Sequence, residues 1–331
     1  MARRRNAPFL LLLAAACSPR PLPPEESFEG EALGTTYQVR LAETLSESER
    51  VGVKSSIDSV FEEVSSKMSA ESPDSDLSKL NRAPAGEELP VSIATLDVFR
   101  EAVQVSELTG GAYDVTAGPL ARAWESDSPA EEEIAAARAR VGFRHLTLDD
   151  DSVTITKEVD SLECDLSGIS RGYAVDRIAE GLEAEGYRSY RIDLGGDVRT
   201  RGKDAAGEAW RIPIEKPTAG ERGIQRALSV SGLAVSTSKN PRVFGDPEGK
   251  PQPPLVDPRT ARPLLGEGLA SVTVLGESCM RAEALANGLM TLGPEEGYEL
   301  AVREDLSVLF LLLDDGKVEE KATPAFADLF F

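Results

Sequence analysis

The sequence predicts an α+β fold in which helices and mixed sheets form a single intertwined unit. In some segments apolar residues recur with the 3.6-residue period of helices, and in others they alternate with polar residues as they do in strands. Several of the alternating segments follow each other across short turns, which indicates β-hairpins. We find no internal repeat and no Gly/Ser-rich linker. The order of the elements also differs from the regular strand-helix alternation of a Rossmann fold.

The first half of the domain is predicted to contain one strand and three helices. The strand is TTYQVRL, residues 35–41. The first helix has a single apolar face, made of Val53, Ile57, Val60, Phe61, Val64 and Met68. A polar loop, residues 68–82, precedes a second helix at 94–109, which Gly110 and Gly111 close. Ser128 and Pro129, followed by acidic residues, predict the cap and first turn of a third helix.

The second half begins with a predicted hairpin at residues 145–156, which turns through an acidic triplet. A helix is expected at 172–185, followed by two short strands within 187–202 that are hinged at Gly195 and Gly196. The remaining predicted elements are a strand at 271–276, a helix at 278–292, a short helix from Pro294 and a strand at 307–313.

The N-terminal 31 residues are expected to lie outside the domain, which spans 32–331. Residues 1–16 have a basic start, a short apolar run and small residues before Cys17, the pattern of a bacterial lipoprotein signal peptide. Residues 17–31 are rich in Pro and Glu and predict a disordered tether. We therefore expect an exported lipoprotein, anchored in a membrane through a lipid on Cys17, on the periplasmic or extracytoplasmic side. Cleavage near Cys17 without lipidation is the alternative.

Charge and cysteine content exclude several classes of protein. The chain of 331 residues has a formal net charge of -21, which disfavours nucleic-acid partners because phosphates are repelled. Besides Cys17 it contains only Cys164 and Cys279, without a CxxC pair, so a structural zinc site or a disulfide framework is not expected. Their spacing does not decide whether these two cysteines form a bridge. The single histidine, His145, is interpreted as a half-exposed strand residue.

The segment DLSGISRGYAVD, residues 165–176, is unusually polar for a junction between an apolar strand and a helix. Gly168 and Gly172 allow the backbone to approach a ligand closely. A helix that starts near Ser170 directs free N–H groups and the positive end of its dipole at an anion, and Arg171 adds a charge with bidentate geometry. The segment predicts an anion site. Taken alone, it is also compatible with an ordinary turn in which Asp165 or Ser170 caps the helix.

Seven segments in a fixed order resemble the family of FAD:protein FMN transferases, the ApbE flavin transferases. The resemblance covers residues 32–331 and is carried by the following segments: LGTTYQVR (33–40), MSAESPDSDLSKLN (68–81), GAYDVTAGPLARAW (111–124), DLSGISRGYAVDRIAE (165–180), RIDLGGDVRTRG (191–202), AVSTS (234–238), and LVDPRTARP (255–263) with AEALANGLMTLGP (282–294). Each segment is a weak signal by itself, whereas their common order is specific.

The resemblance implies a reaction and its participants. The enzyme would cleave the pyrophosphate of its substrate FAD with the help of Mg²⁺ and attach FMN through a phosphoester to a Thr or Ser hydroxyl. The implied acceptor is an exported redox protein that carries an FMN-binding domain. Transfer of this kind needs cations that neutralise the phosphate charge.

The resemblance also assigns the site residues. Asp165 and Arg171 are the implied catalytic residues. The implied cofactor-binding residues are Leu33, Glu71, Ala112, Tyr113, Asp114, Asp165, Arg171, Thr237 and Val256. The implied metal ligands are the carbonyl of Gly168 and the side chains of Glu283 and Asn287, which stand one helical turn apart on one face. Asp193 and Asp197 also match family positions, but we interpret them as residues of a hairpin turn and leave them out of the site.

This chain departs from the family pattern at several positions of the predicted site. Glu283 and Asn287 stand where the family has Asp and Thr, Pro254 replaces a His proposed to assist proton transfer, and Arg171 replaces a Lys. Leu33 replaces a Met, and Glu71 an aromatic residue. Three functions therefore stay open: an active transferase, an FAD-binding lipoprotein without transfer activity, and an FAD pyrophosphatase that releases FMN and AMP.

Overall fold

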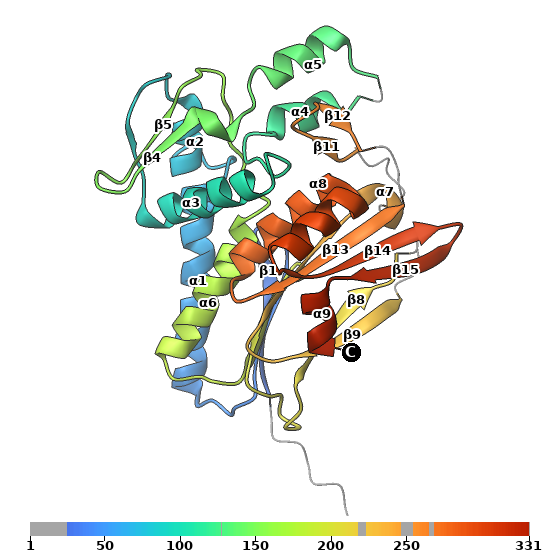
Figure 1. The fold of residues 1–331 in the computed structure, drawn as a ribbon. Helices are drawn as coiled ribbons and strands as arrows, with labels where there is room; N and C mark the ends of the chain where they lie inside the picture. Colours follow the sequence, from blue (N-terminus) through green and yellow to red (C-terminus); the bar gives the residue numbers. More distant parts are fainter. Residues whose placement is uncertain (1–24, 127, 218–222, 246–253, 265–267, 331) are drawn as a thin grey trace, which may run out of the picture.

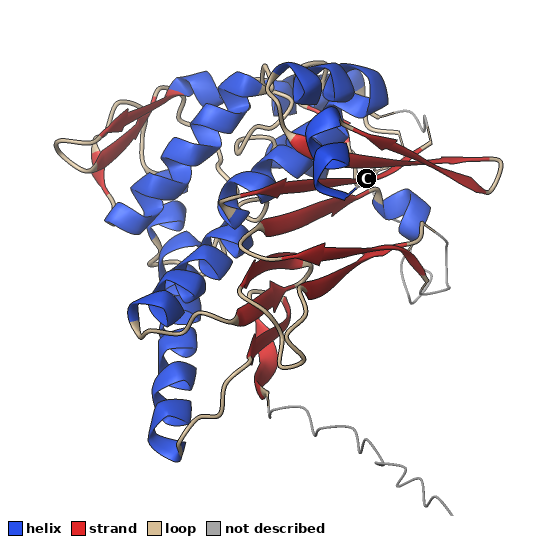
Figure 2. Ribbon diagram, turned by 60° about the horizontal axis from the view of Figure 1, so that its bottom comes forward, coloured by secondary structure: helices blue, strands red, loops and turns tan. Residues whose placement is uncertain are grey.

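The computed structural model describes residues 25–126, 128–217, 223–245, 254–264 and 268–330. An eight-stranded sheet forms the centre of the molecule, and its longest helices cover one face (Figures 1 and 2). The strand order is β1 (Glu26–Ala32), β2 (Thr35–Leu41), β6 (Tyr190–Leu194), β7 (Asp197–Arg201), β10 (Ala234–Lys239), β13 (Leu269–Gly276), β14 (Ser307–Asp314) and β15 (Lys317–Ala322). The α+β class predicted from the sequence is confirmed, and all strand pairs in the described residues are antiparallel.

Both faces of β14 are buried over residues 308–311, which explains its continuous apolar run. Its Val308 and Phe310 belong to the main core under the helices. Its Leu309 and Leu311 point the other way, into a smaller core formed with Phe326, since successive side chains of a strand face opposite sides. This smaller core is closed by the hairpin of β8 (Trp210–Glu215) and β9 (Ile224–Val230) and by α9 (Pro324–Phe330).

The helices that position the site lie against one another on the main face. Helix α6 (Ser170–Ala184) packs between α1 (Glu47–Met68) and α8 (Cys279–Arg303), and α8 lies on β10 and β13 (Figure 1). The remaining helices are α2 (Asp76–Arg82), α3 (Ile93–Leu108), α4 (Gly118–Ala123), α5 (Glu131–Arg138) and α7 (Pro241–Phe244). The remaining strands are β3 (Leu89–Pro90), β4 (Leu146–Asp149), β5 (Thr154–Lys157), β11 (Val256–Asp257) and β12 (Arg262–Pro263).

Several predicted elements are confirmed, and others differ in their bounds. The apolar face of α1 is buried as expected, and α8 bends at Gly293, where the sequence predicts a new helix. The loop expected at 68–82 contains α2, which Ser75 caps. The cap of α5 is Ala130 and not Ser128. His145 ends a short 3-10 turn before β4 and contacts Glu158 at 3.1 Å, so it is not a strand residue.

The expected tether overlaps the folded domain. Residues from Glu26 onward form β1, which pairs with β2 along its whole length, so the domain does not begin at residue 32. Glutamates that suggested disorder form ion pairs instead, Glu25 with Arg40 and Glu26 with Arg50. Phe28 in the same strand is 4% exposed and packs in the main core. An edge strand with several acidic residues thus has the composition of a tether.

The described helices and strands do not test the signal peptide and lipidation predicted for residues 1–17. The predicted signal peptide, residues 1–16, and the predicted lipidation site Cys17 lie outside the described residues. Among the residues that are described, no helix is long and apolar enough to cross a bilayer.

The two cysteines of the domain are buried and unbridged. Cys164 and Cys279 are 3% and 0% exposed, and both are free thiols. Burial raises the pKa of Cys164 to about 12 and raises the pKa of Cys279 well above its usual value.

Because the thiolate is the reactive form of cysteine, we expect neither thiol to react with iodoacetamide in the native protein at about pH 8, and both to react after unfolding. Peptide mass spectrometry distinguishes these two sites from Cys17. Rapid alkylation of either peptide in the native protein would contradict the buried positions.

Candidate active site

One cavity brings together residues that are far apart in the sequence. It has a volume of about 730 Å³ and is lined by the β1–β2 turn, the end of α1 with the loop that follows, and the polar junction before α6. Of the residues predicted to form the site, Leu33, Glu71, Asp165 and Arg171 line this cavity. The loop around Glu71 leads from α1 into α2, so three of the seven segments predicted to act together, 33–40, 68–81 and 165–180, meet here.

Leu33 reaches the cavity through a tight turn. Leu33 and Gly34 connect β1 to β2 with φ values of 49° and 75°, the left-handed pair typical of a two-residue hairpin turn. A residue other than glycine in this conformation costs roughly 1–2 kcal/mol. The turn therefore holds an apolar side chain at the rim of the cavity at some cost to stability.

Asp165 is held in place by the segment before it. The side-chain amide of Asn81, at the end of α2, accepts a hydrogen bond from the Cys164 N–H at 2.7 Å and donates one to the Cys164 carbonyl at 2.9 Å. The next residue, Asp165, donates its N–H to Val115 at 2.6 Å. Its carboxylate accepts the Ser167 N–H at 2.8 Å and stays exposed on the cavity wall. Asn81 thus explains why the 68–81 segment belongs with the site.

Arg171 lines the cavity and contacts two buried carboxylates that lie behind the cavity wall. Its Nε is 3.0 Å from Asp197, and its Nη2 is 2.9 Å from Oε1 of Glu283. Asp197 and Glu283 are 3% and 2% exposed. Burial raises the pKa of Asp197, and burial together with the Asp197 charge raises the pKa of Glu283 well above its usual value, while Arg171 lowers both. One guanidinium is therefore shared by two desolvated acids.

Asp197 belongs to this site, contrary to our interpretation of it as a turn residue. It starts β7, and its other carboxylate oxygen accepts a hydrogen bond from the Ser236 hydroxyl at 2.5 Å. Ser236 is a second residue that sequence reasoning missed. The available signal was the alternation of AVSTS, since neighbouring side chains on β10 point to opposite faces. Asp193 instead pairs with Arg191 and accepts the Gly196 N–H, as expected for a hairpin residue.

Helices α6 and α8 are in direct backbone contact next to Glu283. A β-carbon on Gly172 would lie 2.5 Å from the Cys279 carbonyl oxygen. The Gly172 N–H donates to Oε2 of Glu283 at 2.8 Å. One turn further along α6, Asp176 accepts the N–H groups of Cys279 and Met280, both at 3.0 Å, and so caps the start of α8. Helix α6 therefore holds α8 at two points: Gly172 binds Glu283, and Asp176 binds the first turn of α8.

The predicted metal ligands lie along the same contact. The Asn287 side-chain amide is 3.1 Å from the Gly168 carbonyl oxygen, and Glu283 is one turn before Asn287 on α8. In the described residues no group of three or more His, Cys, Asp or Glu side chains could hold a metal, so a cation here would also need the Gly168 carbonyl and the Asn287 amide.

This donor set fits Mg²⁺, which prefers oxygen ligands. The amide nitrogen of Asn287 faces the Gly168 carbonyl oxygen. A flip of this amide would place its oxygen there instead, so that carboxylate, carbonyl and amide oxygens could all face one cation. In addition, Oε1 of Glu283 is buried and makes no hydrogen bond, although it lies within ion-pair distance of Arg171. This oxygen therefore already faces one cation, the Arg171 guanidinium, and a bound Mg²⁺ would share it.

Comparison with known proteins places the chain in a family. The profile of the ApbE family matches residues 33–310. The FAD:protein FMN transferase of Vibrio cholerae is 36% identical over 324 residues, 96% of this chain and 95% of that protein. The chain belongs to the ApbE family. The FAD:protein FMN transferase of Escherichia coli is 31% identical over 95% of each chain.

Solved structures agree with this assignment. The flavin transferase ApbE from Vibrio cholerae matches with a TM-score of 0.83 at 34% identity, over 93% of this chain and 99% of that one. The apo form of the Pseudomonas stutzeri flavinyl transferase ApbE matches with a TM-score of 0.81 at 31% identity, over 93% and 97% of the two chains. The family resemblance inferred from the motifs is confirmed.

Within this ApbE fold, the segment 112–114 supports the site from behind. Ala112 is buried at 2% exposed. The Tyr113 ring lies against Gly168, 3.7 Å from the position that a β-carbon would take there. The carboxylate of Asp114 is occupied by its own loop, because it accepts the N–H groups of Thr116 at 2.8 Å and of Phe143 at 3.0 Å. Its burial raises its pKa, and its contacts indicate that it braces the loop.

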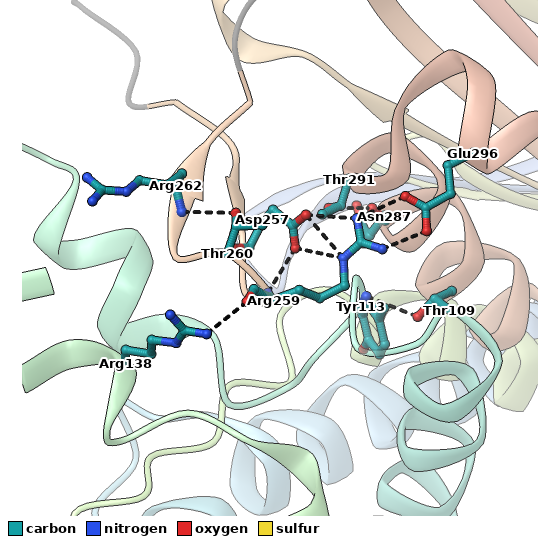
Figure 3. A network of polar contacts seen from close by, with 10 residues as sticks. All are labelled: Thr109, Tyr113, Arg138, Asp257, Arg259, Thr260, Arg262, Asn287, Thr291 and Glu296. Carbon is teal, nitrogen blue, oxygen red and sulfur yellow. Dashed lines mark hydrogen bonds and ion pairs between the residues drawn. The ribbon is translucent and has the colours of Figure 1, made fainter. Parts of the chain in front are cut away.

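Thr237 and Val256 do not line the 730 Å³ cavity. The Thr237 hydroxyl lies 2.9 Å from that of Thr273 on β13. Val256, in β11, packs against the small cluster that includes Leu120 and Ala261. The β11–β12 hairpin is joined to α8 by Arg259, which binds both Asp257 and Glu296 (Figure 3).

The contact of α6 with α8 can be tested with a matched pair of glycines. Gly172→Ala places a methyl group 2.5 Å from a backbone carbonyl, and overpacking of this kind costs about 1–3 kcal/mol. Gly181→Ala, in the same helix, meets no atom within 4 Å and should stabilise the protein by about 0.5–1 kcal/mol. Urea denaturation gives the free energies of unfolding. Equal effects of the two substitutions would contradict the close contact.

Proposed function

We propose that this protein is an FAD:protein FMN transferase that uses Mg²⁺ to transfer FMN from FAD to a Thr or Ser hydroxyl of an exported redox protein. The observation that carries the proposal is the cavity in which Leu33, Glu71, Asp165 and Arg171 meet, next to the hard-oxygen set of Gly168, Glu283 and Asn287. The cavity volume lies in the range of small-molecule sites. Relatives of this chain are named for this reaction.

The residues of the cavity suit both ends of the substrate. Leu33 and Met68 offer apolar contacts to a flat ring, while Ser167, Ser170 and Arg171 offer donors to phosphate oxygens. Arg171 keeps about a third of its side chain exposed while it binds the two buried acids. Its guanidinium can therefore contact a phosphate and remain anchored.

In the reaction, the acceptor hydroxyl oxygen forms a bond to the phosphorus of the FMN half, and the bond from that phosphorus to the oxygen of AMP breaks. The hydroxyl proton needs an acceptor, and Pro254 cannot take it. The cavity wall carries the carboxylates of Glu62, Glu71 and Asp165. Asp165 lies in the same junction as Arg171, and we assign it this role. A bound Mg²⁺ would neutralise charge on the pyrophosphate, and Glu283, Asn287 and the Gly168 carbonyl would hold it.

For localisation, we propose that Cys17 carries a lipid and anchors the protein to a membrane on the extracytoplasmic side. The signal-like residues 1–16 and the small residues before Cys17 support this. The folded domain would then follow the lipid after a short spacer, because β1 begins at Glu26.

The transfer reaction is tested by incubating the protein with FAD, Mg²⁺ and an FMN-binding-domain acceptor and weighing the acceptor. We expect a mass increase equal to one FMN unit. FMN and AMP without modified acceptor would indicate a pyrophosphatase. Tight FAD binding with neither product would indicate an FAD-binding lipoprotein. Both of these results would overturn the transferase proposal.

Arg171 is tested by substitution to Ala. Loss of a hydrogen bond to a charged group costs about 1.5–3 kcal/mol, so FAD affinity should fall ten-fold or more. Arg171→Lys should retain part of the affinity, because the charge remains. The control is Arg177→Ala, since Arg177 lies in the same helix and pairs with Glu180 on the surface. Calorimetry with FAD would show equal affinities for the Arg171→Ala and control variants if Arg171 does not bind the substrate.

The metal ligands are tested by restoring the residues of the family. Mg²⁺ tolerates little error in ligand distance, so the longer Glu283 and the amide of Asn287 should compensate for each other. We expect Glu283→Asp and Asn287→Thr to lower Mg²⁺-dependent FAD turnover singly, and the double variant to recover it. Effects near zero in all three variants would mean that these residues hold no metal.

A further inference from the structure

Tyr113 has a buried hydroxyl without a hydrogen-bond partner among the described residues. The residue is 7% exposed. A buried hydroxyl that makes no hydrogen bond costs roughly 1–3 kcal/mol by mutational measures. A phenylalanine would fill the same space without this cost, so the hydroxyl calls for an explanation.

The position of Tyr113 is set by two glycines of the candidate site. Its Cβ lies 3.1 Å from the position that a β-carbon on Gly288 would take, and its ring reaches the corresponding position on Gly168 at 3.7 Å. Its N–H donates to the Thr109 hydroxyl at 3.1 Å, which holds its backbone at the end of α3 (Figure 3). The ring thus extends from α8 toward the turn that contributes the Gly168 carbonyl.

Glu283 belongs to the same site, and its buried Oε1 lies 2.9 Å from Nη2 of Arg171. Asn287, one turn after Glu283 on α8, has its amide nitrogen 3.1 Å from the position that a β-carbon on Gly168 would take, and the Tyr113 ring lies 3.7 Å from that position. Tyr113 and the predicted metal ligand Asn287 therefore meet at the Gly168 turn. A buried hydroxyl without a partner beside this set of oxygen ligands indicates a polar occupant that it contacts.

We propose that the Tyr113 hydroxyl is a positioning group for the bound cation: it accepts a hydrogen bond from a water of the Mg²⁺ shell at the Gly168 turn. This rests on the proposed function, in which Gly168, Glu283 and Asn287 hold the ion. Mg²⁺ usually retains several waters when bound to proteins, and groups that orient such waters commonly affect metal affinity 10–100-fold. The hydroxyl contacts the shell, while the ring packs on the Gly168 turn.

The test is Tyr113→Phe, with Mg²⁺ titrated by calorimetry into the purified protein without FAD. We expect Mg²⁺ affinity to fall about ten-fold or more. Without Mg²⁺, the variant should be at least as stable as the parent in urea denaturation, because it removes an unsatisfied hydroxyl. Tyr173→Phe is the control: Tyr173 is equally buried at 7% exposed, lies in the same helix as Arg171 and faces a different cavity, so it should leave Mg²⁺ affinity unchanged.

The outcomes separate this inference from the function on which it rests. If the parent protein binds Mg²⁺ and Tyr113→Phe binds it equally well, the role of the hydroxyl is wrong and the transferase proposal is unaffected. A loss of stability in the Mg²⁺-free variant would show that the hydroxyl bonds within the protein, which also overturns the inference. If the parent protein itself binds no Mg²⁺, the metal site fails and this inference fails with it.

Discussion

The site depends on the backbone contact between α6 and α8. Gly172 has no side chain, so the first turn of α8 can lie directly against it. At this distance the Gly172 N–H reaches Glu283, and Asp176, one turn further on, reaches the N–H groups that begin α8. Any side chain at position 172 would separate the helices and remove these contacts. The register of α8, and with it the positions of Glu283 and Asn287, follows from this contact.

The charges of the site have to balance within a protein that is strongly acidic overall. Glu283 and Asp197 are both buried, and burial of an unpaired carboxylate is costly. Arg171 is the cation that serves both. In the proposed reaction Arg171 also contacts the substrate phosphates. A divalent cation bound to Glu283 would pair with that carboxylate in part, so more of the guanidinium charge would act on the phosphates. The cation and the guanidinium are thus complementary parts of one electrostatic arrangement.

The motif residues divide into two groups according to what they contact. Leu33, Glu71, Asp165 and Arg171 face the cavity. Asn81 and Asp114 are occupied by backbone groups and hold the loops from which the first group extends. Since a loop residue can act only if its backbone is fixed, the bracing residues are as necessary to the site as those that would touch FAD.

The sequence by itself was sufficient for most helices and for the family, because apolar periodicity is a local property and the order of the motifs can be read along the chain. Helix α1 and its buried face, and the hairpin β4–β5, follow from periodicity alone. The cavity residues were predicted through the resemblance, not through spacing.

Only the tertiary structure decided the role of Asp197, since its partner Arg171 is 26 residues away and its local sequence is that of a hairpin turn. The same holds for β1, whose acidic composition is typical of a disordered segment until β2, Arg40 and Arg50 are placed beside it. Burial and charge pairing are properties of three-dimensional neighbours. A sequence pattern reports which residues are available for such pairs, and the packing of α6, α8 and the sheet decides which of them meet.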